Sequence, residues 1–160
     1  MYWRPVMEAR TMGKRGFTLV EALIVIVVIG IIAGFGVPRL RGALLKSNVR
    51  SARSAMVTLV AKARAAAVAR GCRSTMSFTS GPSGTVAISV CTVSGTGTEI
   101  LGGVDSLAAR YKVAMTASTG SLQFDPRGLT PGSSGMSVLF TTGKMADTVF
   151  INPLGKVVRP

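Results

Sequence analysis

Residues 17–37 read FTLVEALIVIVVIGIIAGFGV, and this apolar run decides the architecture of the chain. Its only charged residue is Glu21. At about 1.5 Å per residue, a helix of this length reaches roughly 30 Å, the thickness of a bilayer core. The run therefore predicts a membrane-spanning helix. An acid inside such a helix costs about 2.5 to 3.5 kcal/mol, so Glu21 is expected to have a cationic partner.

Two simpler interpretations of the apolar run are a secretory signal peptide and a plain membrane anchor. A signal peptide has a shorter apolar core that is followed by a small-residue cleavage site, whereas this run is long and ends in Pro38 and Arg39. A plain anchor fits the length of the run but gives no reason for Glu21. Neither interpretation accounts for the whole stretch.

The residues at the start of the run add a second signal. KRG at residues 14–16 is followed directly by FTLVE at residues 17–21. This pattern resembles the class III signal of type IV pilins and pseudopilins. In that family a prepilin peptidase cuts after the glycine and methylates the new amino terminus, so the resemblance implies cleavage after Gly16 and methylation of Phe17. The freed amine of Phe17 is a cation, and Glu21 of the same or a neighbouring subunit is its expected counter-charge.

The resemblance also divides the amino-terminal part of the chain. Residues 1–16 are expected to be a cleaved leader, for which Met1, Met7 and Met12 are alternative starts. The cleavage signature implies a single-pass anchor in the bacterial inner membrane, with the rest of the chain in the periplasm. Pro38 and the glycines before it weaken the helix and resemble a segment that loosens during assembly; alternatively, the glycines allow close helix contacts.

An amphipathic helix is expected over residues 38–73, after the transmembrane helix of residues 17–37. Apolar residues recur there at the spacing of one helix face. They are Leu45, Val49, Ala52, Met56, Leu59, Val60, Ala63 and Ala67. This face is expected to pack on a globular domain.

Basic residues follow the same helix. Between residues 39 and 73 there are nine Lys and Arg residues and no acid. In a helical projection, five of them fall within a sector of about 60° beside the apolar face. These five are Arg39, Lys46, Arg50, Arg53 and Arg64. Acids of neighbouring subunits or of a secretion machinery, DNA phosphates, and lipid headgroups near Arg39 and Arg41 are alternative partners.

Residues 74–160 have the texture of a β-rich domain, in which short runs of Thr, Val, Ile and Phe alternate with Gly, Ser and Pro. Strands are expected at residues 74–79, 85–94, 110–117, 121–124, 136–142, 148–151 and 156–159. Breaks are expected at residues 81–84, 95–97, 102–103, 126–128 and 132–135. The fold class is therefore α+β, a long amino-terminal helix packed on an antiparallel β-sheet or sandwich.

The carboxy-terminal third carries another resemblance. LQFDPRGL at residues 122–129 and VFINPLGKVVR at residues 149–159 resemble the end of the GspH/FimT family of minor pseudopilins and minor pilins. Some members of that family bind DNA during transformation. Similar proteins carry a closing glycine-basic-x-arginine turn, and the corresponding segment here, GKVVR at residues 155–159, is one residue longer. The resemblance makes Lys156 and Arg159 candidate DNA contacts, with Arg127 as a third. The helix residues Lys46, Arg50, Arg53 and Arg64 form a competing surface.

Cys72 and Cys91 are expected to pair. Export would place both in an oxidising compartment, where two cysteines in a small domain are usually bridged. In the chain-entropy model, closing a loop of this length stabilises the fold by about 3 kcal/mol. The alternative is a pair of buried free thiols.

Composition excludes several classes of function. The 160 residues hold 19 Lys and Arg against 6 Asp and Glu, a net charge of +13, and no histidine. The commonest general base and zinc ligand is thus missing, and two cysteines cannot complete a four-ligand metal site. The acids of the globular part stand singly along the chain: Glu99, Asp105, Asp125 and Asp147. We therefore expect no enzyme activity, no metal and no cofactor.

The leading interpretation is a structural subunit of a membrane-anchored filament, a minor pilin of a type IV pilus or a minor pseudopilin of a type II secretion system. The alternative is a DNA-binding minor pilin that captures DNA electrostatically for natural transformation. The expected partners are the prepilin peptidase, other pilins or pseudopilins and the inner membrane, with DNA added under the alternative.

Overall fold

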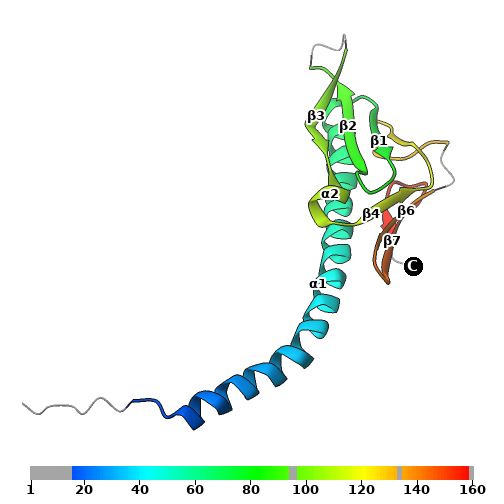
Figure 1. Ribbon diagram of the computed structural model, residues 1–160. Coiled ribbons are helices and arrows are strands. Elements are labelled where there is room, and N and C mark those ends of the chain that lie inside the picture. Colours follow the sequence, from blue (N-terminus) through cyan, green and yellow to red (C-terminus); the bar gives the residue numbers. More distant parts are fainter. Residues whose placement is uncertain (1–15, 94–96, 133–134, 159–160) are drawn as a thin grey trace, which may run out of the picture. The chain divides into compact units, whose positions relative to one another are not determined.

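The computed structural model describes residues 16–93, 97–132 and 135–158 (Figure 1). The chain divides into two compact units, Met1–Leu40 and Arg41–Pro160. Helix α1, Leu19–Arg70, contributes to both units. All the other elements belong to the second unit.

The first unit is the apolar beginning of α1. The hydroxyl of Thr18 accepts a hydrogen bond from the backbone N–H of Glu21 at 3.2 Å, as an N-cap residue does. The helix that begins at Leu19 is long and apolar enough to cross a membrane, judged by length and composition, and its most apolar window has a mean hydropathy of 2.7. The apolar side chains described there are exposed, Leu19 by 82%. These are the properties that residues 17–37 predict.

The helix continues through Pro38. The sequence predicts a helical pattern on both sides of this proline, and the backbone is helical without a break from Leu19 to Arg70. A proline removes one i→i−4 hydrogen bond, and the helical backbone continues despite that loss. The long helix that the sequence predicts, a transmembrane part followed by an amphipathic part, is therefore confirmed.

The part of α1 in the second unit packs through one face, as its spacing predicts. Six of the eight predicted positions are buried in the core: Val49, Ala52, Met56, Val60, Ala63 and Ala67. Leu45 and Leu59 are half-buried. The same core takes side chains from both β-sheets, among them Met76, Phe124 and Phe140. The apolar face of α1 therefore forms one side of the core of the second unit.

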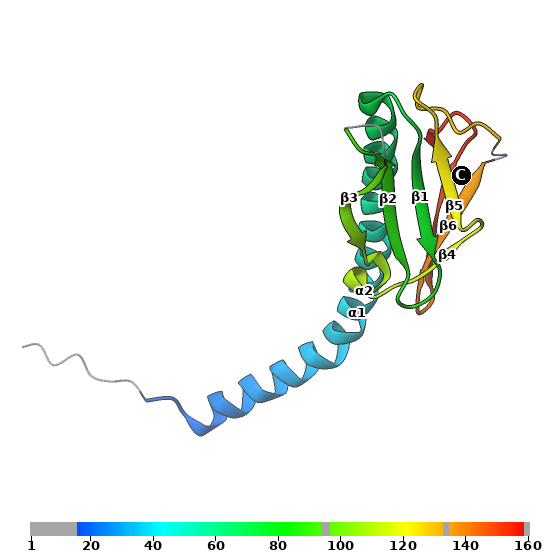
Figure 2. The same cartoon turned by 90° about the horizontal axis from the view of Figure 1, so that it is seen from above.

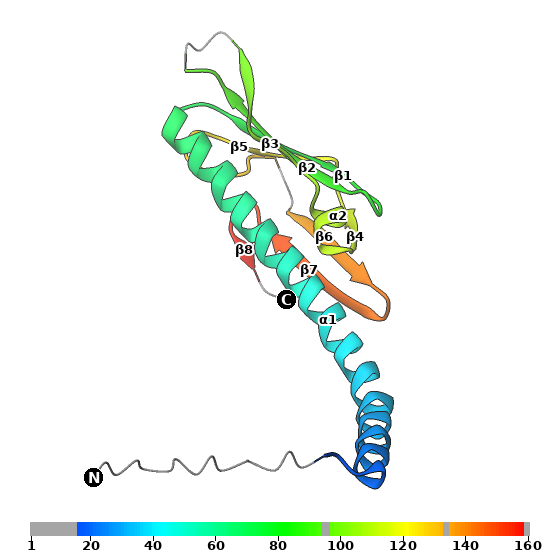
Figure 3. The same ribbon diagram turned by 60° about the vertical axis from the view of Figure 1, so that its left-hand side comes forward.

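Two four-stranded antiparallel sheets cover this face. The first has the order β3-β2-β1-β5, with β1 Ser74–Thr79, β2 Thr85–Cys91, β3 Thr98–Asp105 and β5 Ser121–Phe124. The second has the order β4-β6-β7-β8, with β4 Ala114–Ala117, β6 Met136–Thr142, β7 Met145–Ile151 and β8 Val157–Val158. Figure 2 shows the first sheet along α1, and Figure 3 shows β7 and β8 beside the same helix. The α+β class is confirmed.

Three predicted strands have the limits of β1, β5 and β6, and those predicted at residues 85–94, 148–151 and 156–159 overlap β2, β7 and β8 with other limits. Two elements differ in kind from the prediction. Strand β3 was not predicted, and the break expected at residues 102–103 lies inside it. Gly102 and Gly103 have φ of +80° and +81°, and the register against β2 shifts in this region. Such a bulge lets a glycine pair remain within a strand.

The second difference is helix α2, Leu107–Tyr111, which occupies part of the strand predicted at residues 110–117. Leu107 and Ala108 are buried in the core, and Lys112 ends the helix in the left-handed conformation with φ of +53°. Only β4 is left of the predicted strand. Burial of the helical turn overrides the strand propensity of its neighbours.

The disulfide Cys72–Cys91 joins the end of α1 to the end of β2, with the two Cα atoms 6.3 Å apart. Arg70 strengthens the same junction. Its guanidinium donates to the carbonyl oxygen of Cys91 at 3.2 Å and to Glu99 Oε1 at 2.6 Å. The last turn of α1 is thus tied to both β2 and β3.

Reduction of this disulfide should lower the melting temperature, because the reduced chain regains loop entropy worth about 3 kcal/mol in the unfolded state. Protein from an oxidising compartment should gain two hydrogens in intact-mass analysis on reduction. The Cys72→Ser/Cys91→Ser variant should melt where the reduced protein melts. Free thiols in the unreduced protein would contradict the pairing.

Candidate functional site

The start of α1 presents the residues of the predicted processing motif. A Cβ atom placed on Gly16 would meet no other atom within 4 Å, and the side chain of Phe17 is 76% exposed. Glu21 lies in the first turn of α1 and is exposed. The ion pairs found among the described residues all join residues of the second unit, so none of them includes Glu21. The geometry leaves the backbone after Gly16 open and the carboxylate of Glu21 accessible.

Two loops of the second unit share one design, Asx-Pro-x-Gly, at residues 125–128 and 152–155. Asp125 Oδ1 accepts hydrogen bonds from the backbone N–H groups of Arg127 at 2.9 Å and Leu129 at 2.8 Å. In the second loop, Asn152 Oδ1 accepts in the same way from Leu154 at 3.1 Å and Lys156 at 2.8 Å. The Asx side chain therefore stabilises each turn by accepting hydrogen bonds from backbone N–H groups that follow it.

The backbone closes both loops in the same pattern. The N–H of Asp125 donates to the carbonyl of Leu129 at 2.8 Å, and the N–H of Asn152 donates to that of Lys156 at 2.9 Å. Gly128 and Gly155 have φ of +75° and +70°, which a side chain would disfavour. The sequence predicts a break at residues 126–128 but none at 152–155, and the repeat was missed although the two Asx-Pro-x-Gly segments are its signal.

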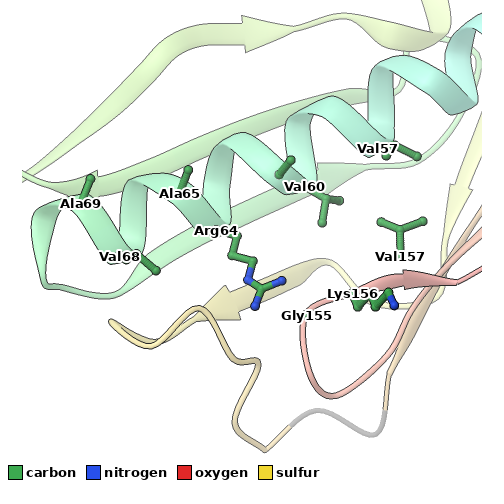
Figure 4. A pocket seen from close by; sticks show the side chains of 10 residues that line it. Val57, Val60, Arg64, Ala65, Val68, Ala69, Gly155, Lys156 and Val157 are labelled. Carbon is green, nitrogen blue, oxygen red and sulfur yellow. The ribbon is translucent and has the colours of Figure 1, made fainter.

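The two loops stack on each other and on α1. A Cβ atom on Gly155 would lie 2.8 Å from the carbonyl oxygen of Gly128, and one on Gly128 would lie 2.8 Å from Arg64 Nε. The buried hydroxyl of Thr130 donates to the carbonyl oxygen of Pro153 at 2.7 Å. In Figure 4 Arg64 extends from α1 toward the loop that carries Gly155. The order of contact is therefore α1, first loop, second loop.

This stack brings together three of the predicted basic residues. Arg64, Arg127 and Lys156 are exposed, and each belongs to the stack or contacts it. Lys156 stands immediately before β8, and the second loop fixes its backbone. Arg159, the other predicted contact of the closing turn, lies outside the described residues.

The remaining predicted basic residues divide into free and paired side chains. Lys46 and Arg50 are exposed on α1. Arg53 is half-buried and donates from Nη1 to both carboxylate oxygens of Asp147 at 3.1 Å. This pairing joins α1 to β7, so Arg53 serves the fold and is not available as a free cation.

All four acids of the described second unit are used inside the molecule. Three form ion pairs: Arg53–Asp147 at 3.1 Å, Arg70–Glu99 at 2.6 Å and Arg110–Asp105 at 2.8 Å. The fourth, Asp125, accepts the backbone hydrogen bonds of its own loop. The expectation that these acids lie singly holds along the sequence but not in space. The exposed charge that remains is cationic.

Comparisons with known proteins agree with this architecture. A family model described as the prokaryotic N-terminal methylation motif matches residues 11–37, and one described as type II transport protein GspH matches residues 52–155. The crystal structure of the type IV minor pilin FimU of Pseudomonas aeruginosa (strain PAO1) superposes with a TM-score of 0.58 at 13% identity. The match covers 71% of this chain and 89% of that one. No curated protein matches the sequence significantly.

An amino-terminal methylation motif, a long apolar helix and a two-sheet domain packed on that helix define the class of pilin-like subunits. Within this class the chain belongs to the GspH family, whose model covers most of the second unit. Members are structural subunits of the minor pilin or pseudopilin kind and are not enzymes.

The stacked loops should not tolerate a side chain at Gly155. In Gly155→Ala the new methyl group meets the Gly128 carbonyl at 2.8 Å and a Phe124 ring carbon at 2.9 Å, on a backbone of positive φ. The free energy of unfolding should fall by about 1–3 kcal/mol. Gly120→Ala is the matched control, because a Cβ atom there has no neighbour within 4 Å. Equal melting temperatures for the two variants would show that the loops do not depend on this contact.

Proposed function

We propose that the chain is a minor subunit of an inner-membrane-anchored filament, either a type IV pilus or a type II secretion pseudopilus. The observation that carries the proposal is the order of the two family matches, with the methylation motif at residues 11–37 preceding the GspH domain at residues 52–155. The domain would lie in the periplasm, and the subunit would be built in beside other pilins or pseudopilins.

Maturation by a prepilin peptidase is part of this proposal. The peptidase would remove residues 1–16 and methylate the amine of Phe17, leaving residues 17–37 as the transmembrane helix, 38–73 as the connecting helix and 74–160 as the β-rich domain. The open backbone at Gly16 and the exposed Phe17 support the proposed cut, since a protease needs access to the bond it cleaves.

Glu21 would be the charged residue whose ion pair positions the subunit in the filament. Glu21 lies in the first turn of α1, four residues after Phe17, and none of the ion pairs among the described residues includes it. In an apolar bundle it needs a cation, which the mature amine of the same or a neighbouring subunit supplies. Pro38 would help the neighbouring helical segment adjust during packing.

Replacement of Glu21 by Leu should leave membrane insertion intact, because it removes an intramembrane charge, yet it should abolish incorporation into filaments. The measurement is the amount of the subunit in sheared filaments relative to the membrane fraction. Val20→Leu is the neighbouring control. Intact mass should show methylated Phe17 as the first residue of the wild type. Normal incorporation of the Glu21 variant, or any other mature terminus, would contradict the proposal.

DNA capture is a second candidate function, favoured by the charge distribution. The acids of the described second unit are engaged internally, whereas Lys156, Arg127 and Arg64 remain exposed at the stacked loops. Such cations would track phosphates without regard to sequence. Arg159 would join Lys156, and the α1 residues Lys46 and Arg50 would be the competing surface.

For DNA capture, neutralising three to five phosphates gives a log-log salt slope of about −3 to −4.5 on duplex DNA. Changing Lys156 and Arg159 together to alanine should flatten that slope by about two and weaken binding to all sequences alike. The detergent-solubilised full chain is titrated across salt concentrations, with Lys144→Ala as an exposed control. Unchanged binding by the double variant, or none at low salt, would remove this second function.

A further inference from the structure

A groove lies between α1 and residues 155–157. Its volume is about 600 Å³. Val57, Ala61 and Val68 line it from α1, while Lys156 and Val157 line it from the opposite side (Figure 4). Val68 is 52% exposed although its neighbours on the inner face of α1 are buried. The groove is therefore an apolar surface without a partner among the described residues.

A second hollow extends the groove along α1. It measures about 580 Å³, shares Val57 and Val157 with the first and adds Arg50 and Ser54. From Arg50 to Ala69 a helix rises about 28 Å, or roughly five turns. The combined groove thus follows about five turns of α1, which forms one wall of it.

Cations border the apolar lining at three points. Arg50 lies at one end, Lys156 lies beside Val157, which both hollows share, and Arg64 lies farther along α1. The single acid in the lining, Asp147, is held by Arg53 through both carboxylate oxygens. The free charge around the groove is therefore positive.

We propose that this groove binds an amphipathic helix of a different filament subunit, one whose apolar face is flanked by acidic residues. The proposal rests on the proposed function for the identity of the partner as a filament subunit. A helix fits the five-turn length, whereas β8 has only two residues and is too short a template for an added strand. The acids of the partner would meet Arg50, Arg64 and Lys156.

A second copy of the chain does not fit the same groove. Its own connecting helix would have to supply the acids, but no acid occurs between Glu21 and Glu99. Like charges would face each other, which disfavours self-packing and selects a different subunit. A single-stranded nucleic acid is also mismatched, because the lining is aliphatic and offers its bases no aromatic surface for stacking.

The test uses the detergent-solubilised full chain and two synthetic helical peptides. Each peptide has about 20 residues, enough to span the groove at roughly 1.5 Å per residue. One carries Leu and Ala on its apolar face with Glu at both borders, and the other has Lys in place of each Glu. Fluorescence anisotropy should show the acidic peptide binding at least about tenfold more tightly, with an affinity that falls as salt rises.

Variants locate the binding surface. Val68→Asp should abolish binding of the acidic peptide, whereas Val104→Asp, at a residue 58% exposed on β3, should leave it unchanged. Arg50→Glu combined with Lys156→Glu should weaken binding about tenfold or more, and Lys144→Glu should not. Circular dichroism of each variant verifies the fold, and Ala61→Trp, which fills the groove without a charge, should block the peptide as well.

Several outcomes would overturn the proposal. Equal affinity for the two peptides, unchanged binding by Val68→Asp and Ala61→Trp, or displacement of the peptide by a second copy of the chain would each do so. Displacement by duplex DNA that Ala61→Trp also blocks would assign the groove to nucleic acid instead. The peptide assay requires neither processing nor filament assembly. If the acidic peptide binds as expected but the wild-type chain is not incorporated into filaments in cells, the proposed function is refuted and the binding of an acidic helix in the groove is not.

Discussion

The burial of one face of α1 is the interaction on which the second unit depends. Val49, Met56 and Val60 supply bulk along that face, and the alanines between and beyond them let the sheets approach the helix closely. Both sheets contribute to the same core, so neither has a separate one. Since burial of each large apolar side chain is worth about 1.5–3 kcal/mol, this shared face holds the two sheets together more strongly than the short strands could alone.

The same helix meets two environments, and its composition changes accordingly. Up to Leu40 its described apolar side chains are exposed on all sides, which suits lipid or other helices as the surroundings. Beyond Arg41 one apolar face is buried in the domain, and the exposed remainder carries basic residues beside the apolar strip of Val57, Ala61 and Val68 that lines the groove. The loop at residues 125–128 packs on Arg64, and the loop at residues 152–155 packs on the first loop, so α1 also positions the residues just before β8.

Local patterns allowed much of this to be predicted, and long-range contacts explain what was missed. Short runs of apolar and β-branched residues between Gly-, Ser- and Pro-rich breaks predicted the limits of β1, β5 and β6, and the helical spacing predicted the buried face of α1. Strand β3 was not predicted, because a glycine pair is typical of a turn. Only the pairing with β2, which the sequence does not show, keeps these glycines within a strand. The Arg53–Asp147 pair joins residues 94 positions apart, a distance over which spacing carries no signal.

Charge links the fold to the choice of partner. Because the described acids of the second unit are engaged with its own arginines or its own backbone, any partner must bring negative charge of its own. Lys156 would serve both proposed partners, since it borders the groove and also stands in the closing turn. An acidic helix in the groove would therefore cover this cation, and a subunit flanked on that side could not offer it to DNA. Capture of DNA and lateral packing would exclude each other at this surface, and only a subunit whose groove is empty, such as one at the end of a filament, would present the cation to solvent.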